Sequence, residues 1–479
     1  MESINLHLDK YDVEISIDRY QPYDEPAHAR WCDIWFYLNS EEVNETVGGE
    51  ELCSNEADII YQYITDILNG VNRTDSYRTI EPYYELRESR EEDCLMEWII
   101  PKRDLSGKYK YDGSRILRFK RKDLEILQAY LGEITNHRMD ILSKGKEIIK
   151  AGILGTVVGD ALGVPVEFSS REERKIDPVA DMREYGTHSQ PKGTWSDDSS
   201  MMLATMDSMV VRGGVRYDDI MAKFVMWRKH GDYTPYGNVF DVGITCDRAI
   251  TNFRYGSDPT ECGGTGERDN GNGSLMRIMP IALFEAMNPD YWNEEMYYYN
   301  IEEVQDVSRL THGHPRSQMA CVIYASICHE LIFRNGRSIE EAVQYAISRT
   351  LENYSAAWEA QSWFDTDFYD EINADKFKRL RNIAEFKNLS VDEIRSSGYV
   401  VDTLEAAIWC LLNTKSYKEC TLKAVNLGDD TDTVGAVAGG IAGLAFGYDN
   451  IPSDWLSVIA SKEWIEVLCE DFHKMLSDY

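Results

Sequence analysis

The sequence lacks the features that mark secreted, membrane-spanning or disulfide-bonded proteins. In residues 1–20 no basic segment precedes an apolar one, so we expect no secretory signal. No run reaches the roughly 18 apolar residues that a membrane helix needs, and the best candidate, residues 434–446, is short and rich in glycine and alanine. The ten cysteines form no Cys-x-x-Cys pair, which favours reduced thiols over a disulfide framework or a zinc site. The sequence therefore predicts a cytoplasmic protein without a membrane segment.

Basic residues are also scarce. The 479-residue chain has 83 acidic and 50 basic side chains, which give a formal charge of -33. A surface of this sign repels nucleic-acid phosphates and anionic lipids, so it argues against general nucleic-acid binding. It suits a basic protein partner, and it also serves simply to keep a protein in solution. The length allows more than one domain.

Residues 1–142 have the pattern of a small α+β domain. Several short runs alternate apolar and polar side chains, as half-buried strands do, and one segment instead repeats at helical spacing. We find no internal sequence repeat. The pattern predicts strands within residues 4–8, 13–17, 31–38 and 95–100 and a helix over residues 55–71.

A basic stretch interrupts this acidic region. Nine Lys and Arg residues fall between Lys102 and Lys122, including Arg118, Lys120 and Arg121. One interpretation is a solvated hairpin followed by the start of a helix. The other is a surface patch that binds an acidic ligand or partner.

From about residue 143 the pattern changes to that of an all-α domain, which we expect to span residues 143–479. Apolar residues recur at helical spacing, and glycine clusters separate the helical segments. The charged and aromatic stretch 353–397 is expected to be an excursion from the core. Predicted helices cover residues 201–211, 317–333, 403–412 and 434–446.

Two acidic segments each precede a predicted helix: Ser196-Asp197-Asp198-Ser199 and Asp429-Asp430-Thr431-Asp432-Thr433. Ser and Asp are favoured N-cap residues, so either segment alone is explained as a helix cap. Carboxylates and hydroxyls are also the hard oxygen ligands of magnesium, manganese or calcium. The second segment has three carboxylates in four residues, more than one cap needs, and a cation would neutralise the excess.

The small residues that follow the second acidic segment predict a central helix. Residues 435–443 are mostly Gly and Ala, and helices without bulky side chains let neighbouring backbones approach closely. A central helix whose first turn carries carboxylates would place them at the floor of a cleft.

Glu167 follows a glycine-spaced segment that should be helical until Gly163 and Pro165 end it. Glu167 should therefore lie on a loop, where a lone glutamate is usually solvated. A second glycine motif, Gly271-Asn272-Gly273-Ser274, could direct backbone N–H groups at an anion, with a helix expected after it. It is not a Walker A loop, because no Gly-Lys-Ser/Thr follows.

His312 and His314 lie on an expected turn, Thr311-His312-Gly313-His314-Pro315. Two histidines at this spacing could bind a metal, but no third soft ligand is nearby. The alternative is that they are packed or capping residues. We find no nucleophile elbow and no Ser-His-Asp pattern.

The order of these motifs carries more information than any one of them. Gly-Asp-x-x-Gly-x-Pro-x-Glu, Ser-Asp-Asp-Ser, Gly-Asn-Gly, Thr-His and Asp-x-Asp-Thr before a Gly/Ala-rich helix follow one another along the chain. This order closely resembles the ADP-ribosylglycohydrolase family, which includes the dinitrogenase-reductase activating glycohydrolases. The resemblance covers about residues 148–450 and does not extend to residues 1–142.

The resemblance implies an all-α fold with a centre of two Mg²⁺ or Mn²⁺ ions in a cleft. One ion would be held by Ser196, Asp197, Asp198 and Asp432. The other would be surrounded by Asp198, Asp430, Asp432 and Thr433. Ser196 stands where the family usually has Thr, and it keeps the hydroxyl.

The resemblance also implies roles for residues around that centre. Glu167 matches the glutamate that approaches metals and substrate, and His312 matches a histidine near the ligand. The loop that grips the diphosphate would consist of Asn272, Gly273 and Ser274. Asp241 resembles an aspartate proposed as an acid in some members, although this match is weaker. Water would cleave the bond at the ribose anomeric carbon, with Asp197 and Asp198 at the centre and Glu167 or Asp241 handling the proton.

The expected function is therefore metal-dependent removal of ADP-ribose from a modified protein. One alternative is a binding or immunity protein that neutralises an ADP-ribosylating toxin, with residues 1–142 contacting the toxin or the modified target. Another is hydrolysis of a small ADP-ribose derivative. The sequence leaves open whether the acceptor is Arg, Ser, another residue or a nucleobase.

Overall fold

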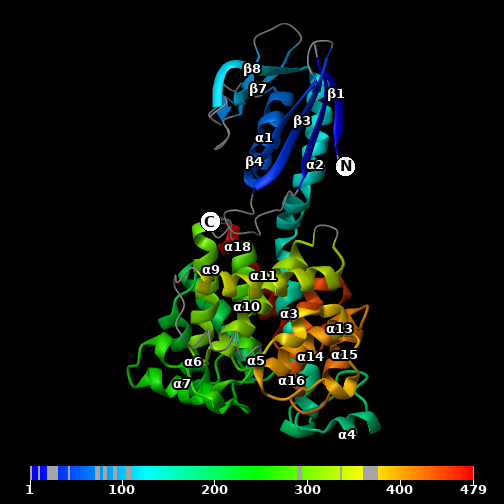
Figure 1. The fold of residues 1–479 in the computed structure, drawn as a ribbon. Helices are drawn as coiled ribbons and strands as arrows, with labels where there is room; N and C mark the ends of the chain where they lie inside the picture. The colour runs from blue at the N-terminus through cyan, green and yellow to red at the C-terminus, as the bar shows by residue number, and fades with distance from the viewer. Residues whose placement is uncertain are drawn as a thin grey trace. The chain divides into compact units, whose positions relative to one another are not determined.

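The computed structural model describes residues 3–8, 11–18, 31–40, 44–70, 76–78, 84–89, 94–103, 109–287, 294–334, 337–359 and 376–477. These residues form two compact units, and each is described by itself. The first unit contains Met1–Leu142 with Trp292–Tyr297, and the second contains Ser143–Tyr291 and Tyr298–Tyr479. Helices dominate the chain, and the antiparallel sheets lie in the first unit, so the predicted fold class is confirmed (Figure 1).

The first unit is built twice from four antiparallel strands followed by a helix. Each sheet follows chain order, β1-β2-β3-β4 and β5-β6-β7-β8. The expected strands and helix all form. The elements are β1 (Ile4–Leu8), β2 (Tyr11–Asp18), β3 (Trp31–Asn39), β4 (Asn44–Cys53), α1 (Ser54–Leu68), β5 (Tyr77–Arg78), β6 (Glu85–Glu88), β7 (Met96–Arg103), β8 (Tyr109–Phe119) and α2 (Arg121–Ser143).

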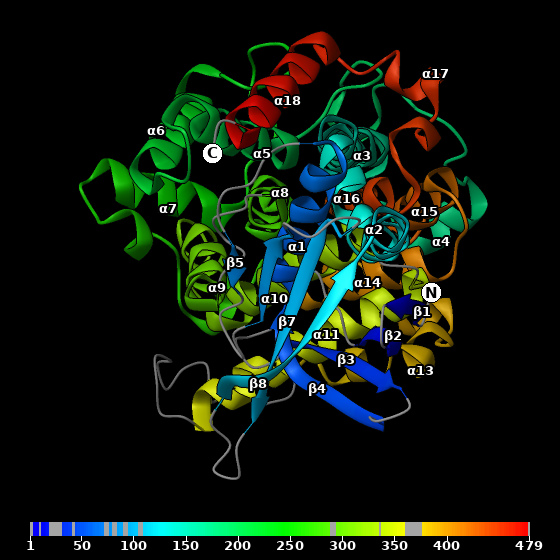
Figure 2. The same cartoon turned by 90° about the horizontal axis from the view of Figure 1, so that it is seen from above.

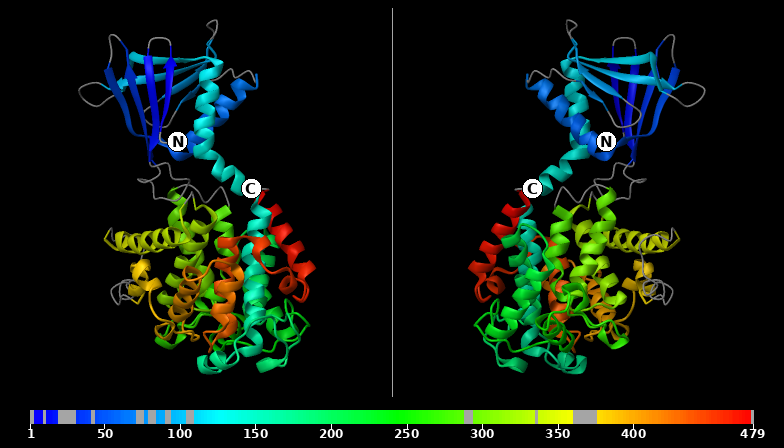
Figure 3. Two further views of the ribbon diagram at one scale, coloured as in Figure 1. Left: turned by 90° about the vertical axis from the view of Figure 1, so that its right-hand side faces the viewer. Right: turned by 90° about the vertical axis from the view of Figure 1, so that its left-hand side faces the viewer.

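Both halves of the unit share one core. Alternate residues of the strands are buried with the apolar faces of α1 and α2. Figure 3 shows these two helices beside the strands. The Tyr130 hydroxyl of α2 accepts a hydrogen bond from the backbone N–H of Ile17 at 2.8 Å, and Gln128 donates to Thr65 of α1 at 2.8 Å. The sequence does not reveal that the two halves share a topology. A strand only needs apolar and polar residues to alternate, and many different apolar residues satisfy that pattern, so the halves need not be similar in sequence.

The basic stretch forms the hairpin β7–β8 and the first turn of α2, as one interpretation predicts. Two of its charges pair with acids, one on the adjacent strand β7 and one on β4 of the other sheet. Arg118 donates to Glu97 at 3.0 Å, and Arg115 donates to Glu45 at 2.8 Å. Residues 104–108 lie outside the described part of the chain.

The second unit is helical, as predicted. Its helices are α3 (Gly145–Gly163), α4 (Arg171–Ile176), α5 (Asp197–Arg212), α6 (Tyr217–His230), α7 (Ile244–Arg254), α8 (Met279–Met287), α9 (Glu294–Arg309, which belongs to this unit from Tyr298 on), α10 (Pro315–Ile332), α11 (Ile339–Glu359), α13 (Ile383–Lys387), α14 (Val400–Leu412), α15 (Tyr417–Val425), α16 (Thr431–Phe446), α17 (Ser453–Leu456) and α18 (Lys462–Ser477). Part of the expected excursion, residues 360–375, lies outside the described residues. Of the rest, residues 353–359 form the end of α11, and residues 376–397 contain short helical turns and α13.

Helices α3 and α16 lie side by side at the centre of this unit (Figure 2). Their glycines face each other so closely that the two backbones touch. A Cβ added to Gly159 would lie 2.0 Å from the carbonyl oxygen of Gly435, and one added to Gly443 would lie 2.0 Å from that of Ala151. The expectation that small residues allow close backbone approach is therefore confirmed.

The longest apolar helix differs from the expected one. Gly145–Val166 is long and apolar enough to cross a membrane, whereas the sequence favours residues 434–446 as the best candidate. Within the described residues it is the one helix that passes this test, and 89% of its apolar window is buried inside the protein. Its apolar character is explained by its position in the core. The eight cysteines whose side chains the structure describes are free and buried, which fits reduced thiols.

Candidate functional site

The carboxylate of Asp160, near the end of α3, caps α5. It accepts hydrogen bonds from the backbone N–H groups of Ser196 at 3.0 Å and Ser199 at 3.1 Å, and from the Ser199 hydroxyl at 2.6 Å. Ser196 is the N-cap residue, and its hydroxyl accepts a long bond of 3.3 Å from the N–H of Asp198. Because Asp160 and Ser196 serve as the cap, the carboxylates of Asp197 and Asp198 remain for another role.

The second acidic segment begins α16. Asp430 is the N-cap residue, but its side chain makes no capping bond. Its Oδ2 instead accepts from the amide of Asn272 at 2.8 Å, and the same amide donates to Thr403 at 2.9 Å. The side chain of Asp432 accepts from the N–H of Thr433 at 2.9 Å. Helix capping therefore does not explain why a carboxylate stands at position 430.

The two acidic segments, at the starts of α5 and α16, contact each other. The Thr433 hydroxyl donates to Oδ1 of Asp198 at 3.3 Å. Asp197 and Asp198 lie in the first turn of α5, and Asp432 lies in the first turn of α16, rather than before the helices as expected. Acidic side chains are favourable in the first turn of a helix. Each helix therefore begins at its acidic residues, before the first residue of its apolar repeat.

These carboxylates are buried close together. Burial and neighbouring carboxylates raise the pKa of Asp197, Asp198 and Asp432 well above the usual range, and burial raises the pKa of Asp430. Oδ2 of Asp198 has no hydrogen-bond partner. No Lys or Arg of the described residues forms an ion pair with any of the four. Buried negative charge with an unpaired oxygen fits a bound divalent cation.

Glu167 reaches this cluster from a strained loop. Its carboxylate oxygen and those of Asp430 and Asp432 lie within 4.8 Å of one another. The loop is fixed by backbone hydrogen bonds of 2.7 Å from Phe168 N–H to the Asp429 carbonyl and from Asp429 N–H to the Ser169 carbonyl. Phe168 and Asp429 have φ angles of 62° and 61°, a conformation that non-glycine residues rarely adopt and that often marks functional sites. Glu167 is 5% exposed, so the usual solvated loop glutamate does not describe it.

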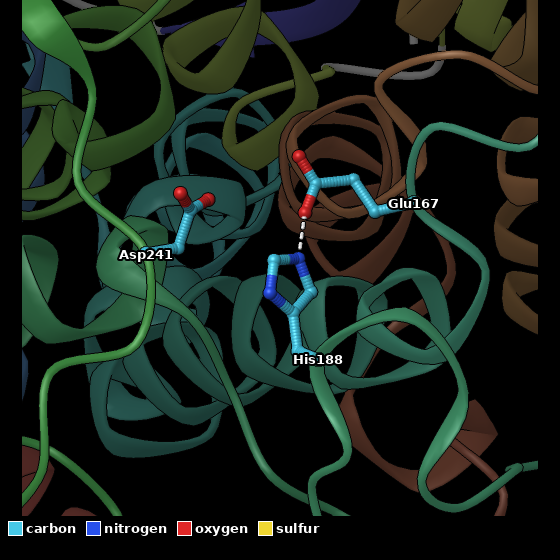
Figure 4. A group of neighbouring side chains, drawn as sticks. All are labelled: Glu167, His188 and Asp241. Atoms are coloured by element: carbon cyan, nitrogen blue, oxygen red, sulfur yellow. Dashed lines mark hydrogen bonds and ion pairs between the residues drawn. The ribbon is translucent and has the colours of Figure 1, made fainter.

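His188 forms a second group with Glu167 and Asp241 (Figure 4). Its Nε2 hydrogen-bonds the Glu167 carboxylate. Its ring packs near Phe168 and Phe240, with centroids 6.0 Å and 5.2 Å away. The Glu167 carboxylate raises the pKa of His188, and burial raises the pKa of Glu167 despite the bond to His188.

Asp241 lies on the loop before α7 and is partly exposed. Its Oδ1 accepts from the N–H of Val242 at 2.9 Å. Two residues on, the N–H of Gly243 donates to Oδ2 of Asp197 at 3.3 Å. The structure therefore brings the loop of Asp241 beside the acidic segment of α5.

The Gly271–Ser274 loop packs against His312. Ser274 is fully buried and accepts a hydrogen bond from Ser308 at 2.9 Å. Asn272 is committed to Asp430, as described above. The segment after the loop is a 3₁₀ turn, Leu275–Arg277, and α8 begins only at Met279. The expected helix therefore does not follow the loop directly, because the chain first makes this tight turn.

The two histidines of the turn have different surroundings. His312 is 2% exposed, and its Nδ1 lies 2.9 Å from the Thr311 hydroxyl. His314 is the N-cap of α10 and accepts from the N–H of Arg316 at 3.1 Å. His312 is therefore packed in the interior and His314 is a helix cap, which is the arrangement that one of the two interpretations predicts.

Sequence reasoning missed two residues of this site. Asp160 is part of the Gly159-Asp160 motif, but the sequence predicts only that it lies in a helix. His188 stands in a segment without a motif, and no sequence signal connects it with Glu167, which lies 21 positions away.

Comparisons with known proteins give the family. The family model for ADP-ribosylglycohydrolase matches residues 143–478. The chain is 31% identical over 338 residues to the ADP-ribosylarginine hydrolase Tri1 of Serratia proteamaculans, which covers 70% of this chain and 81% of that relative. It is 32% identical to the ADP-ribosyl-[dinitrogen reductase] glycohydrolase of Rhodospirillum rubrum, over 64% of this chain and 89% of the relative.

A solved structure supports the same assignment. The structure titled "ADP-ribosylglycohydrolase-related protein complex" aligns with a TM-score of 0.54 and 28% identity, over 70% of this chain and 99% of that chain. The resemblance seen in the sequence is confirmed. The chain belongs to the ADP-ribosylglycohydrolase family and is a hydrolase of glycosidic bonds.

Proposed function

We propose that this enzyme removes ADP-ribose from arginine side chains of a modified protein, with two Mg²⁺ or Mn²⁺ ions bound at the acidic cluster. The observation that carries the proposal is the cluster itself. Four carboxylates from the starts of α5 and α16, three of them buried and that of Asp430 partly exposed, lie near one another without a basic partner among the described residues. The arginine acceptor is inferred from the name of the relative Tri1, which is 31% identical.

The residues that would hold the ions are Ser196, Asp197, Asp198, Asp430, Asp432 and Thr433. Their oxygen-only donor set suits hard divalent cations. When bound, such cations neutralise the carboxylates, bind vicinal ribose hydroxyls and lower the pKa of a water molecule. Asn272 supports this set, since its amide holds Oδ2 of Asp430 at 2.8 Å.

Glu167 is the residue that we propose to accept and return the proton during water attack. Its carboxylate lies beside Asp430 and Asp432, and it is hydrogen-bonded to His188. Burial raises its pKa, which brings a carboxyl closer to the range useful for proton transfer near neutral pH. Asp241 is the second candidate, because one of its oxygens lies within 4.8 Å of Glu167 and His188.

The Gly271–Ser274 loop is proposed to hold the diphosphate through its backbone. The side chains of Asn272 and Ser274 already bond to Asp430 and Ser308, so they are poorly placed to bind a phosphate. Successive backbone N–H groups of such a loop can form a concavity that binds an anion. The imidazole of His312 lies against the same loop.

The test uses a protein carrying arginine-linked ADP-ribose and a second one carrying the serine linkage. We expect release of ADP-ribose from the arginine-linked protein, loss of release in EDTA, and recovery with Mg²⁺ or Mn²⁺. The double variant Asp430→Asn and Asp432→Asn should lose at least ~100-fold in kcat, because removing metal-ligand charge removes the ions. Equal activity of the wild type in EDTA would refute metal dependence, and release from the serine linkage alone would refute the arginine acceptor.

Asp429→Asn is the matched control. Asp429 is in the same segment but exposed, with a φ of 61° that Asn tolerates. It should keep full activity, so a loss confined to the double variant reports on the ligands and not on the segment.

We further propose that residues 1–142 recognise a protein, either the modified target or an ADP-ribosylating toxin. These residues have their own core and lie outside the matched family domain, residues 143–478. Cells exposed to an ADP-ribosylating toxin provide the test. Protection that survives in the Asp430/Asp432 double variant would indicate steric blocking of the toxin, and loss of protection would indicate that hydrolysis is the protective activity.

A further inference from the structure

Arg277 is a buried cation without an acidic partner. It is fully buried at the end of the 3₁₀ turn that follows the Gly271–Ser274 loop, and it forms no ion pair within the described residues. Its Nε and Nη1 have no hydrogen-bond partner. Its guanidinium carbon lies 5.0 Å from the centroid of the Phe224 ring, which is a cation–π contact. A buried charge without an acidic partner still calls for a functional explanation.

The hydrogen bonds that Arg277 does make lead to His312. Its Nη2 donates to the carbonyl of Val307 at 2.8 Å and to the hydroxyl of Thr311 at 2.9 Å. The Thr311 oxygen lies 2.9 Å from Nδ1 of His312. The hydroxyl can accept from Arg277 and donate its own proton to Nδ1, and in that arrangement Nδ1 is unprotonated.

The other edge of the imidazole faces the glycine loop. A Cβ added to Gly271 would lie 3.2 Å from Nε2 of His312, and one added to Gly273 would lie 2.8 Å from its Cε1. The ring therefore occupies the space that these two glycines leave open. Within the described residues, Nε2 makes no hydrogen bond.

Ser308 links the Gly271–Ser274 loop to His312 through hydrogen bonds. The Ser308 hydroxyl lies 2.9 Å from the Ser274 hydroxyl and 3.2 Å from the carbonyl of His312. The loop and the ring thus have a fixed relative position, and Nε2 is held at the loop's main chain.

We propose that Arg277 and Thr311 are positioning residues that hold His312 as the neutral tautomer with its proton on Nε2, so that Nε2–H is a fixed donor to an anionic ligand at the Gly271–Ser274 loop. The ligand would be a diphosphate, an assignment that rests on the proposed function. The tautomer itself does not depend on that function.

The positive charge of Arg277 also favours the neutral form of the His312 ring. Burial, with the nearby positive charge of Arg277 as the next cause, lowers the pKa of His312 to about 3. An arginine remains charged at neutral pH, so a cation placed here disfavours a second proton on the imidazole. A neutral side chain at position 277 could make the same hydrogen bond to Thr311 without this effect.

The first experiment is NMR of the full chain labelled with ¹⁵N-histidine. There are nine histidines, and the signals of His312 are identified by their loss in His312→Gln. At pH 7 we expect one neutral ring with a protonated Nε2 and an unprotonated Nδ1. A proton on Nδ1, or on both nitrogens, in the wild type would overturn the proposal without any variant.

The second experiment removes the Thr311 hydroxyl at nearly constant volume. Thr311→Val should give a mixture of tautomers, and the Kd of ADP-ribose measured by calorimetry should rise about 10-fold, as expected for a lost hydrogen bond to a charged group. Thr311→Ser restores a hydroxyl and should restore both the tautomer and the Kd, which a purely structural role of the methyl group would not do. Arg277→Lys keeps the charge and should leave the ring neutral.

The outcomes separate this inference from the proposed function. Thr311→Val with the wild-type tautomer and Kd would overturn the inference even if the enzyme is active. If the wild type does not bind ADP-ribose, the proposed function fails, and the wild-type tautomer still decides the role of Arg277 and Thr311.

Discussion

The close contact of α3 with α16 leads to a sharp prediction for Gly159→Ala. The new Cβ would lie 2.0 Å from the carbonyl oxygen of Gly435 and 2.6 Å from its carbonyl carbon. Both atoms belong to the backbone of α16, so no side chain can turn away. To reach an ordinary contact of 3.4 Å, the two helices must separate locally by about 1.4 Å.

A matched control lies in the same helix. Gly152→Ala would place its Cβ 3.0 Å from Sδ of Met279 and 3.4 Å from Cδ1 of Leu283, the flexible ends of side chains. Both variants gain about 1 kcal/mol of helix propensity. Only Gly159→Ala also incurs an overpacking cost of about 1–3 kcal/mol or more. We expect its free energy of unfolding to be about 3 kcal/mol below that of Gly152→Ala.

The assay is thermal unfolding of both variants with EDTA and with Mn²⁺. Gly159→Ala should melt ~6 °C or more below Gly152→Ala. It should also lose most of the stabilisation by Mn²⁺, because moving α16 takes Asp432 away from Asp198. Equal melting temperatures and equal responses to Mn²⁺ would refute the reasoning, since they would mean that the backbone contact neither limits the volume at Gly159 nor sets the geometry of the acidic cluster.

Three further predictions concern the charges of the site. Asp198→Asn should raise the Tm of the protein in EDTA, because it removes one buried negative charge. It should also abolish the Tm rise that Mn²⁺ gives the wild type, which reflects a stabilisation of about 2.7 kcal/mol at 100 times Kd; a wild-type response to Mn²⁺ would contradict this. Burial raises the pKa of Asp160 from 3.8 to about 7, so between these pH values the folded state binds more protons than the unfolded state, and stability in EDTA should fall as pH rises from 4 to 7. The contribution of Asp160 is measured as the difference in Tm between the wild type and Asp160→Asn across this pH range. A difference that does not change with pH would show that the pKa of Asp160 is not raised. His188→Ala should lower kcat about 10-fold with little change in KM, because Glu167 loses the ring that holds its carboxylate, and an unchanged kcat would remove His188 from the site.

Much of the fold could be predicted from the sequence. The predicted helix over residues 403–412 lies within α14, Val400–Leu412, and the predicted strand over residues 4–8 is β1. Apolar periodicity is a local property, so it is visible without the tertiary structure. The starts of α5 and α16 were predicted several residues late, because the acidic residues of their first turns interrupt the apolar pattern.

The candidate site could be predicted only in part. The order of the motifs singled out the two acidic segments, Glu167 and the glycine loop before any coordinates were known. It could not say that Asn272 bonds to Asp430, or that Ser274 faces the core. One-dimensional spacing identifies which residues matter, whereas the direction of a side chain depends on the backbone around it.

The sequence by itself determined the residue types, their order and the glycine pattern that lets α3 touch α16. The tertiary structure alone decided which groups meet: Asp160 with the start of α5, His188 with Glu167, and Arg277 through Thr311 with His312. Hydrogen bonds act over about 3 Å, and most of these partners are more than 20 positions apart in the chain. Whether such groups come within bonding distance is settled by the packing of the helices that carry them.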